Sequence, residues 1–593
     1  MEEMIEVITM LEKIIFINDN EAKMKITTNE TFSKDLMNLH LIFDDGERRI
    51  LGEIEEIDGD IVNVQFLGEF KDNTLVPGVI RKPKLNSSVR LISDDELNII
   101  MNTNDKKSFS FGTSVLYNRP VNVNVDDLFS GHVAIFGNTG SGKSYGVARI
   151  LQSLYQNPNN IALNSMILLF DAHGEYTSAF KNINTINQNY KVKRYSTDTS
   201  DEANLMSIPL WLLDIDDIAC LLGATEYSQL SIIEKTIFVL AILTQGNDNA
   251  AKYKNHIIAK SIQTLMYSNL SATRIRSEIF DILSICSTNE LSMNIEIPGI
   301  GYTREFRKCF DINKTGTFAE NILVSEYIEQ FINDDLEKQA TKMVGKCSLT
   351  DLEDALNFVI ISENILSNEK LYNSAMMLKM RLHALVVGGY SKYFEYQNYV
   401  NLEGYIADLV TENGQVRTQI IDFNIEGLED QFAYFITRTY SKLMFDFVAN
   451  LKNRASIPVH IFLEEAHRFV KDDYNIIYGN NVFESIAKEG RKYGIILTLI
   501  SQRPTELSET VLSQCSSFLL FRTNHPRDLE YMKKAIPNIN TDIIEKQRSI
   551  QPGYCVGLGK AFKIPMIIKL EAPTPPPQSS NALVFDIWSG HFK

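Results

Sequence analysis

The chain has 593 residues, of which 44% are hydrophobic and 22% are charged. This length is too great for one core and indicates about two to four domains of ordinary globular composition. No apolar run reaches the roughly 18 residues of a membrane-spanning helix, and the acidic N-terminus has no signal-peptide pattern. Six cysteines without a C-x-x-C pair indicate reduced thiols in a cytoplasmic protein, and they argue against a zinc site or a disulfide framework.

The formal net charge of −17 restricts the ways in which the chain could bind nucleic acid. A protein that coats nucleic acid needs Lys and Arg at each phosphate contact, so this charge disfavours one. It does not exclude a protein that threads nucleic acid through a narrow basic channel, because the local charge distribution decides a site.

Residues 1–105 contain short runs in which apolar and polar side chains alternate. Turn signals with Asp and Gly at residues 44–46 and 58–60 separate some of these runs. The expected strands cover residues 13–17, 39–43, 61–66 and 89–92. Short strands at this spacing predict a small β-barrel.

Residues 137–144 fit the phosphate-loop pattern G-x-x-x-x-G-K-[ST] at every fixed position. A short buried strand is predicted before the loop, at residues 133–136, and a helix after it, at residues 145–156, so a chance glycine-rich turn is disfavoured. Lys143 is expected to reach the β- and γ-phosphates, and the Ser144 hydroxyl to ligate Mg²⁺. The candidate residues are Gly137, Asn138, Thr139, Gly140, Ser141, Gly142, Lys143 and Ser144. The sequence therefore predicts binding of a nucleoside triphosphate.

A second buried strand is predicted at residues 165–170, and mostly amphipathic segments follow between residues 205 and 400. Apolar spacing of three and four predicts helices at residues 228–244, 255–266, 319–332 and 373–386. We interpret this block as a helical insertion between strands of the nucleotide-binding core.

Buried strands are predicted again in the C-terminal third of the chain. They cover residues 419–423, 459–463, 495–500 and 517–521, with a long helix at 430–452. Continuous apolar strands separated by helices predict a parallel sheet covered on both faces. A proline-rich stretch at residues 572–577 leads to an apolar terminus at 582–588, which could fold back on its own domain or dock on a neighbouring subunit or partner.

Two carboxylates, Glu464 and Glu465, directly follow the strand at residues 459–463. This position suits a Walker B element, in which Glu464 would hold the Mg²⁺ shell and Glu465 would orient the water that attacks the γ-phosphate. The usual first residue of such a pair is Asp, whereas this chain has Glu. Two acids in the first turn of a helix are the alternative interpretation.

Two further polar residues flank the strand at residues 495–500. Gln502 follows it and could sense the γ-phosphate, or it could simply bond to loop backbone. Arg491 precedes it in the segment EGRKYG at residues 489–494 and could act as an arginine finger on the triphosphate of a neighbouring subunit. A solvated arginine at a helix end is the alternative.

Together these motifs resemble the HerA branch of the HerA/FtsK ATPases. The matching segments are HVAIFGNTGSGKS (132–144), DAHGEY (171–176), FLEEAHRF (462–469), EGRKYG (489–494), LISQRPTEL (499–507) and LSQC (512–515). Ala172 stands where this family usually has proline. The N-terminal strands are similar to the HAS-barrel that precedes the ATPase core of the family, and the helical insertion has the same place.

The resemblance implies an α/β fold with a RecA-like P-loop core, an N-terminal HAS-barrel-like domain and a helical insertion. The expected segments are 1–105 (barrel), 106–204 (first part of the core), 205–400 (insertion), 401–570 (second part of the core) and 571–593 (C-terminal tail). It implies a homohexameric ring ATPase that moves double-stranded DNA and uses ATP and Mg²⁺. Within that ring, Glu465 is catalytic, Gln502 is the sensor and Arg491 is the finger acting between subunits, with Arg522 in reserve.

The resemblance also implies a partner. Family members act with a nuclease of the NurA type, and bacterial relatives act with sirtuin-like NADases or other effectors in defence against phage. Our hypothesis is an ATP-driven DNA translocase that serves as the motor of such a complex. The alternative is an ATPase ring that acts mainly as a scaffold and allosteric regulator of its effector.

Overall fold

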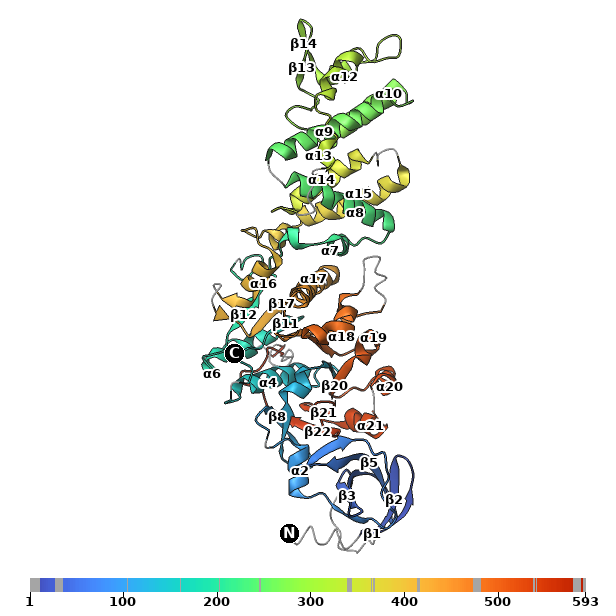
Figure 1. Ribbon diagram of the computed structural model, residues 1–593, viewed down its shortest axis with the longest axis vertical. Coiled ribbons are helices and arrows are strands. Elements are labelled where there is room, and N and C mark those ends of the chain that lie inside the picture. Colours follow the sequence, from blue (N-terminus) through green and yellow to red (C-terminus); the bar gives the residue numbers. More distant parts are fainter. Residues whose placement is uncertain are drawn as a thin grey trace.

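The computed structural model of the chain is elongated (Figure 1). An N-terminal sheet lies at one end, a large central sheet lies in the middle, and a helical block lies at the other end. The structure describes residues 11–26, 36–103, 105–159, 161–201, 203–244, 247–338, 344–363, 365, 368–412, 416–472, 481–536, 539, 541–579 and 588–589. The domain boundaries expected at residues 105, 204, 400 and 570 stay predictions.

The N-terminal sheet is antiparallel and has seven strands. These are β1 (Leu11–Ile17), β2 (Glu21–Ile26), β3 (His40–Asp44), β4 (Arg49–Asp58), β5 (Ile61–Lys71), β6 (Thr74–Pro77) and β7 (Ser88–Leu91). The strand order is β1-β2-β5-β4-β3-β7, and β6 pairs with β5. Alternate residues such as Leu41, Val62 and Val64 form its core. The predicted small β-barrel is confirmed, and strands β2 and β4, which the sequence analysis missed, complete its order.

The central sheet has eleven strands. These are β8 (Ser108–Ser114), β9 (Pro120–Asn124), β10 (His132–Phe136), β11 (Ile167–Asp171), β12 (Val192–Tyr195), β17 (Ile420–Asn424), β18 (Val459–Leu463), β19 (Ile495–Ser501), β20 (Cys515–Leu520), β21 (Tyr554–Gly559) and β22 (Met566–Leu570). Their order is β12-β17-β11-β18-β19-β10-β20-β21-β22-β8-β9. In this order, the neighbouring strands from β12 through β20 run parallel, as predicted.

The remaining four strands extend the sheet beyond the strands from which the parallel arrangement was predicted. Strands β21, β22, β8 and β9 pair antiparallel along the edge that begins at β20. The pairs β8–β9 and β21–β22 are each joined by a short connection, which allows only antiparallel pairing. Continuous apolar strands separated by helices therefore indicate parallel pairing only in the part of the sheet from β12 through β20.

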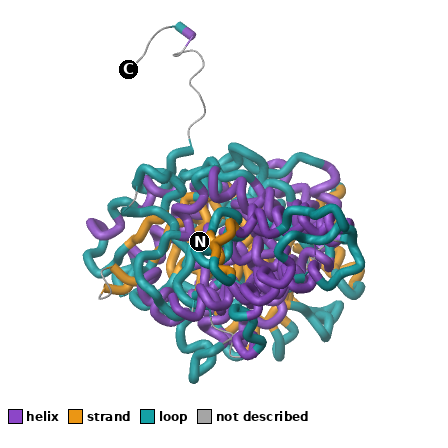
Figure 2. The backbone as a smooth tube through the Cα atoms, turned by 90° about the horizontal axis from the view of Figure 1, so that it is seen from above, coloured by secondary structure: helices purple, strands orange, loops and turns teal. Residues whose placement is uncertain are grey.

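Helices cover both faces of the central sheet. They are α2 (Asp94–Ile100), α3 (Val125–Phe129), α4 (Lys143–Gln156), α5 (Tyr176–Phe180), α6 (Ile183–Ile186), α17 (Asp430–Ala449), η4 (Ala466–Arg468), α18 (Val482–Tyr493), η5 (Pro504–Glu506), α19 (Glu509–Ser513), α20 (Pro526–Ala535) and α21 (Thr541–Ser549). In β18, Ile461 and Leu463 face the core that contains α17 and α18, whereas Phe462 faces the core that contains α4. Figure 2 shows the strands lying among helices and loops. The predicted α/β class is confirmed.

The helical block lies in the chain between β12 and β17, as predicted. Its helices are η1 (Leu210–Leu212), α7 (Ile215–Leu221), α8 (Tyr227–Leu243), α9 (Asn247–Met266), α10 (Ala272–Ile285), α11 (Phe306–Cys309), α12 (Asn321–Glu329), α13 (Asp335–Lys338), α14 (Leu349–Ser362), α15 (Glu369–Val387), η3 (Tyr390–Phe394) and α16 (Leu402–Val410). Two small hairpins join them: β13 (Glu296–Gly299) with β14 (Tyr302–Glu305), and β15 (Thr411–Glu412) with β16 (Val416–Arg417).

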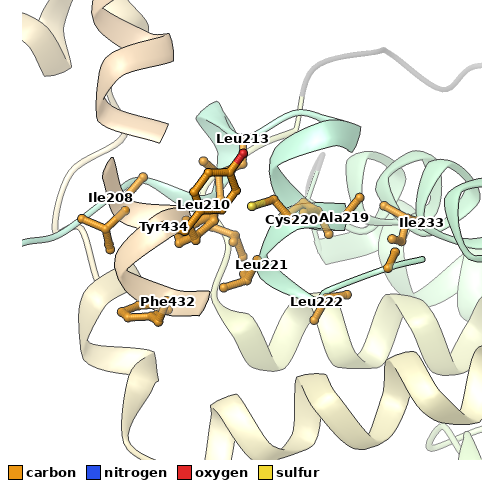
Figure 3. Packing of buried hydrophobic residues seen from close by; sticks show 14 of the residues in the cluster. Ile208, Leu210, Leu213, Ala219, Cys220, Leu221, Leu222, Ile233, Phe432 and Tyr434 are labelled. Carbon is orange, nitrogen blue, oxygen red and sulfur yellow. The ribbon is translucent and has the colours of Figure 1, made fainter. Parts of the chain in front are cut away.

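The base of this block packs on α17 of the core. Leu210, Leu213 and Cys220 form one apolar cluster with Tyr434 (Figure 3). At the same junction Asp217 of α7 and Arg438 of α17 form a buried ion pair. Apolar packing and a compensated pair of charges thus join block and core.

The described part of the C-terminal tail folds back on its own core. The Gln152 side chain of α4 accepts a hydrogen bond from Thr574 N (2.8 Å) and donates one to Pro575 O (2.8 Å). Residues 582–587 of the predicted apolar terminus lie outside the described residues, and the Trp588 side chain is exposed.

The six cysteines are buried and free, as predicted. Within the described ranges, every helix is too short or too polar to cross a membrane.

Candidate nucleotide site

The phosphate-loop residues 137–144 connect β10 to α4 at the carboxyl edge of the parallel strands. Gly142 caps the N-terminus of α4 with φ of 100°, a left-handed conformation that side chains other than glycine rarely adopt. A Cβ atom at this position would also lie 3.1 Å from Gly553 N. The sequence therefore places a glycine where both the backbone conformation and the available space require one.

The Lys143 ammonium group lies inside the loop. Its Nζ donates hydrogen bonds to Gly137 O (2.7 Å) and Asn138 O (3.1 Å). Burial lowers the pKa of Lys143, and the nearby carboxylates of Glu465 and Glu464 oppose this shift. The predicted phosphate-binding lysine and the predicted Walker B pair are therefore electrostatic neighbours.

Glu464 follows β18 and forms a carboxyl pair with Asp171, the last residue of β11. The Asp171 carboxylate accepts backbone hydrogen bonds from residues 173, 175 and 176 at 2.8–3.2 Å, and Glu464 Oε2 accepts one from Ala172 N at 3.1 Å. Burial, followed by the charge of Asp171, raises the pKa of Glu464 well above its usual value. A divalent cation would compensate this buried pair, so the residues present fit Mg²⁺.

Ser144 is half-buried at the first turn of α4. Burial raises the pKa of the Tyr176 phenol, the charge of Glu464 raises it further, and the nearby Ser144 hydroxyl lowers it. Ser144 and Glu464, the two predicted metal ligands, therefore both affect the pKa of the same tyrosine.

Glu465 lies between two imidazole rings. Its Oε1 is 3.6 Å from His173 Nε2, and its Oε2 is 3.2 Å from His467 Nδ1. Burial disfavours the charged form of Glu465, but the nearby His173 imidazole and the charges of His467 and Lys143 outweigh it, so its pKa is lowered. Sequence reasoning included both histidines in its motifs without a role for either; their place beside Glu465 depends on which strands pair.

The two members of the Glu464–Glu465 pair therefore have opposite protonation tendencies. One carboxyl is pushed toward its neutral form by burial and Asp171, and the other is held as a carboxylate by neighbouring cationic groups. Such a division is typical of sites in which two acids have different tasks. It disfavours the alternative in which both are ordinary charges at a helix start.

Gln502 follows β19 and contacts the phosphate loop directly. The Thr139 hydroxyl donates to Gln502 Oε1 at 2.5 Å. The candidate sensor is therefore joined to the loop that binds phosphate, 363 positions away in the chain.

Arg491 lies away from this cluster. It is exposed in the last turn of α18, and its Nη2 donates to Gln514 O (2.7 Å) just before β20 begins, at the amino edge of the parallel strands. Arg522, by contrast, follows β20 at the carboxyl edge, and its carbonyl oxygen accepts a hydrogen bond from Asn138 N (2.9 Å). The chain thus brings together residues 137–144, Glu464, Glu465 and Gln502, but it keeps Arg491 at the opposite edge.

Comparisons with known proteins give one family match and several relatives. The model of the family "Helicase HerA, central domain" matches residues 110–293. The "DNA double-strand break repair helicase HerA" of Pyrococcus furiosus is 24% identical over 537 residues, which cover 88% of this chain and 78% of that protein. The "Probable DNA double-strand break repair helicase HerA" of Methanocaldococcus jannaschii is 24% identical, with 88% of each chain covered. Among solved structures, VirB4 of Thermoanaerobacter pseudethanolicus has a TM-score of 0.42 and 14% identity over 79% of this chain and 97% of that one.

The backbone of Glu465 supplies a stability prediction. Its φ of 48° and ψ of 45° lie in the left-handed region, which costs a residue with a Cβ atom about 1–2 kcal/mol. We expect Glu465→Gly to be more stable than Glu465→Ala by about 1 kcal/mol, measured by the midpoint of thermal unfolding. Glu464, whose φ is not positive, is the matched control. There Gly should be less stable than Ala, and the same ranking at both positions would contradict strain at Glu465.

Proposed function

Because the chain belongs to the HerA-type P-loop ATPases, we propose that it hydrolyses ATP to move double-stranded DNA through a homohexameric ring. The observation that carries this proposal is the meeting of Lys143, Glu464, Glu465 and Gln502 at one edge of the central sheet, from three distant parts of the chain. Such a set combines phosphate binding, metal binding, activation of water and sensing of the γ-phosphate.

The residues of one subunit divide the work of hydrolysis. The backbone N–H groups at the start of α4 hold the phosphates, and Lys143 turns from the loop carbonyls toward the β- and γ-phosphates. Ser144 and Glu464 would hold Mg²⁺, which when bound offsets the negative charge of the phosphates. Glu465, kept as a carboxylate by its cationic neighbours, orients the attacking water and accepts its proton.

Arg491 acts on the ATP of a neighbouring subunit. Its position at the amino edge prevents it from reaching the phosphate loop of its own chain, whereas a ring brings one subunit's edge to the next subunit's site. A guanidinium placed there offsets the charge that develops in the transition state. Arg522, which follows β20, is the reserve candidate for this finger between subunits.

The ring acts in the cytoplasm with an effector, a NurA-like nuclease or a sirtuin-like NADase, in DNA end processing or defence against phage. The names of the archaeal relatives, which are DNA-repair helicases, support the DNA substrate. A second candidate function is an ATPase ring that mainly assembles and regulates its effector. The net charge of −17 favours this second candidate, because DNA binding needs local positive charge.

Two substitutions separate nucleotide binding from hydrolysis. We expect Lys143→Ala to abolish binding of ATP, because the phosphates lose their cation. Glu465→Ala should bind ATP but lose about 10²–10⁴-fold in kcat, because no base orients the water. A fluorescent ATP analogue and a phosphate-release assay measure the two effects, and the exposed Lys181→Ala is the matched control. Wild-type hydrolysis by Lys143→Ala would end this assignment.

Mixed rings test the place of Arg491. Neither Arg491→Ala nor Lys143→Ala subunits alone should hydrolyse ATP. Co-assembled, they should recover part of the rate, because some interfaces then combine an intact phosphate loop with an intact Arg491. Mixtures as inactive as either parent would mean that the finger lies elsewhere or acts within its own subunit.

Duplex DNA distinguishes the motor from the scaffold. A translocating ring should hydrolyse ATP faster with duplex DNA, and the apparent DNA affinity should fall with salt at a log–log slope of about −0.9 per neutralised phosphate. The assay is a titration of DNA at several salt concentrations, with and without the co-purified effector. Absence of stimulation in both conditions would favour the scaffold.

A further inference from the structure

His132 is the first residue of β10, the strand that leads directly into the phosphate loop. The side chain is completely buried at the amino edge of the parallel strands. It lies 11 residues before Lys143 in the chain and at the opposite end of β10 from the phosphate loop. The hydrolytic mechanism gives it no role.

Both ring nitrogens of His132 are engaged. Nδ1 accepts a hydrogen bond from Leu497 N of β19 at 2.9 Å, so this nitrogen carries no proton. Nε2 therefore carries the proton, and it donates to Ala487 O of α18 at 3.1 Å. Burial, followed by the charge of Arg491, lowers the pKa of His132 to about 4, which keeps the ring in this neutral form near pH 7. The imidazole thus joins β10, β19 and α18.

The carbonyl that His132 holds belongs to the turn that carries Arg491. In an α-helix the C=O of residue 487 also accepts the N–H of residue 491, four positions later. The Arg491 side chain returns toward the same point, because a Cβ atom on Gly131 would lie 3.3 Å from Arg491 Nη2. Arg491 is therefore anchored at two places, through its backbone near His132 and through its hydrogen bond to Gln514 O.

We propose that His132 is a positioning residue that fixes the Arg491 turn of α18 relative to the phosphate-loop strand. It thereby sets where Arg491 enters the nucleotide site of the neighbouring subunit. This inference rests on the proposed function of Arg491 between subunits. It adds a mechanical link: the strand that binds a subunit's own ATP at one end holds, at its other end, the arginine that serves the next subunit's ATP.

Substitution of His132 by Asn or by Gln tests its two hydrogen bonds separately, because each amide side chain resembles one half of the imidazole. His132→Asn keeps an acceptor near the Nδ1 position but loses the donor toward Ala487. His132→Gln keeps a donor near the Nε2 position. If the bond to α18 matters for Arg491, the Asn variant should be impaired and the Gln variant largely rescued.

Mixed rings show in which subunit His132 acts. The reference mixture contains Lys143→Ala subunits, which provide Arg491, and Arg491→Ala subunits, which provide the intact phosphate loop. Adding His132→Asn to the arginine-providing subunits should lower the restored kcat by up to about 100-fold, the cost of a displacement of about 1 Å. Adding it instead to the subunits that bind ATP should leave the rate close to the reference.

His460→Asn in the arginine-providing subunits is the matched control. His460 is also buried, at the same edge of the sheet, and within the described residues it forms no hydrogen bond to α18. ATP binding and ring assembly are measured for every variant. If His132→Asn subunits do not assemble, the Gln variant decides the question, because it must then retain most of the restored rate.

Three results would overturn the inference. Equal losses from His132→Asn in either subunit would mean that His132 supports its own phosphate loop. An unchanged rate, or a loss matched by His460→Asn, would mean that the His132 imidazole does not position Arg491. A reference mixture without any recovery would overturn the role of Arg491 between subunits and, with it, this inference.

Discussion

The parallel alignment of β11, β18, β19 and β10 is the constraint on which the nucleotide site depends. Adjacent parallel strands end at the same edge, and the pairings Phe136 with Ser501 and Phe170 with Leu463 place the segments that follow them side by side. The phosphate loop, Asp171, the Glu464–Glu465 pair and Gln502 meet for this reason, although more than 360 residues separate the first from the last. No single loop has to be long to bring them together.

Burial at this edge then sets the charge of each group. The Asp171 carboxylate accepts three backbone N–H groups and Glu464 accepts one, while burial and the charge of Asp171 disfavour Glu464 as an anion. Glu465, one residue further on, turns through a left-handed conformation into a position among His173, His467 and Lys143, and it stays charged. One residue of backbone strain thus separates a carboxyl group whose pKa is raised from one whose pKa is lowered.

Features that depend on local pattern could be predicted from the sequence. The phosphate loop, the strands that precede Glu464 and Gln502, and the order of barrel, core and helical block follow from motif spacing and hydrophobic periodicity. Features that depend on which strands pair could not. The Thr139–Gln502 hydrogen bond, the two histidines beside Glu465 and the antiparallel strands at one edge of the sheet each join segments that carry no mutual signal in the chain.

The central sheet connects Arg491 to the phosphate loop of its own subunit, although the two lie at opposite edges. β10 is a fully buried strand of five residues, about 17 Å long, that packs between β19 and β20 and bends little. If the phosphate loop shifts on binding or losing the γ-phosphate, such a strand would carry the shift to its His132 end. Because His132 holds the turn that presents Arg491, the state of one site would reach the next through a strand and a helix end. Such a path would give a ring a structural reason to hydrolyse ATP in sequence around its subunits.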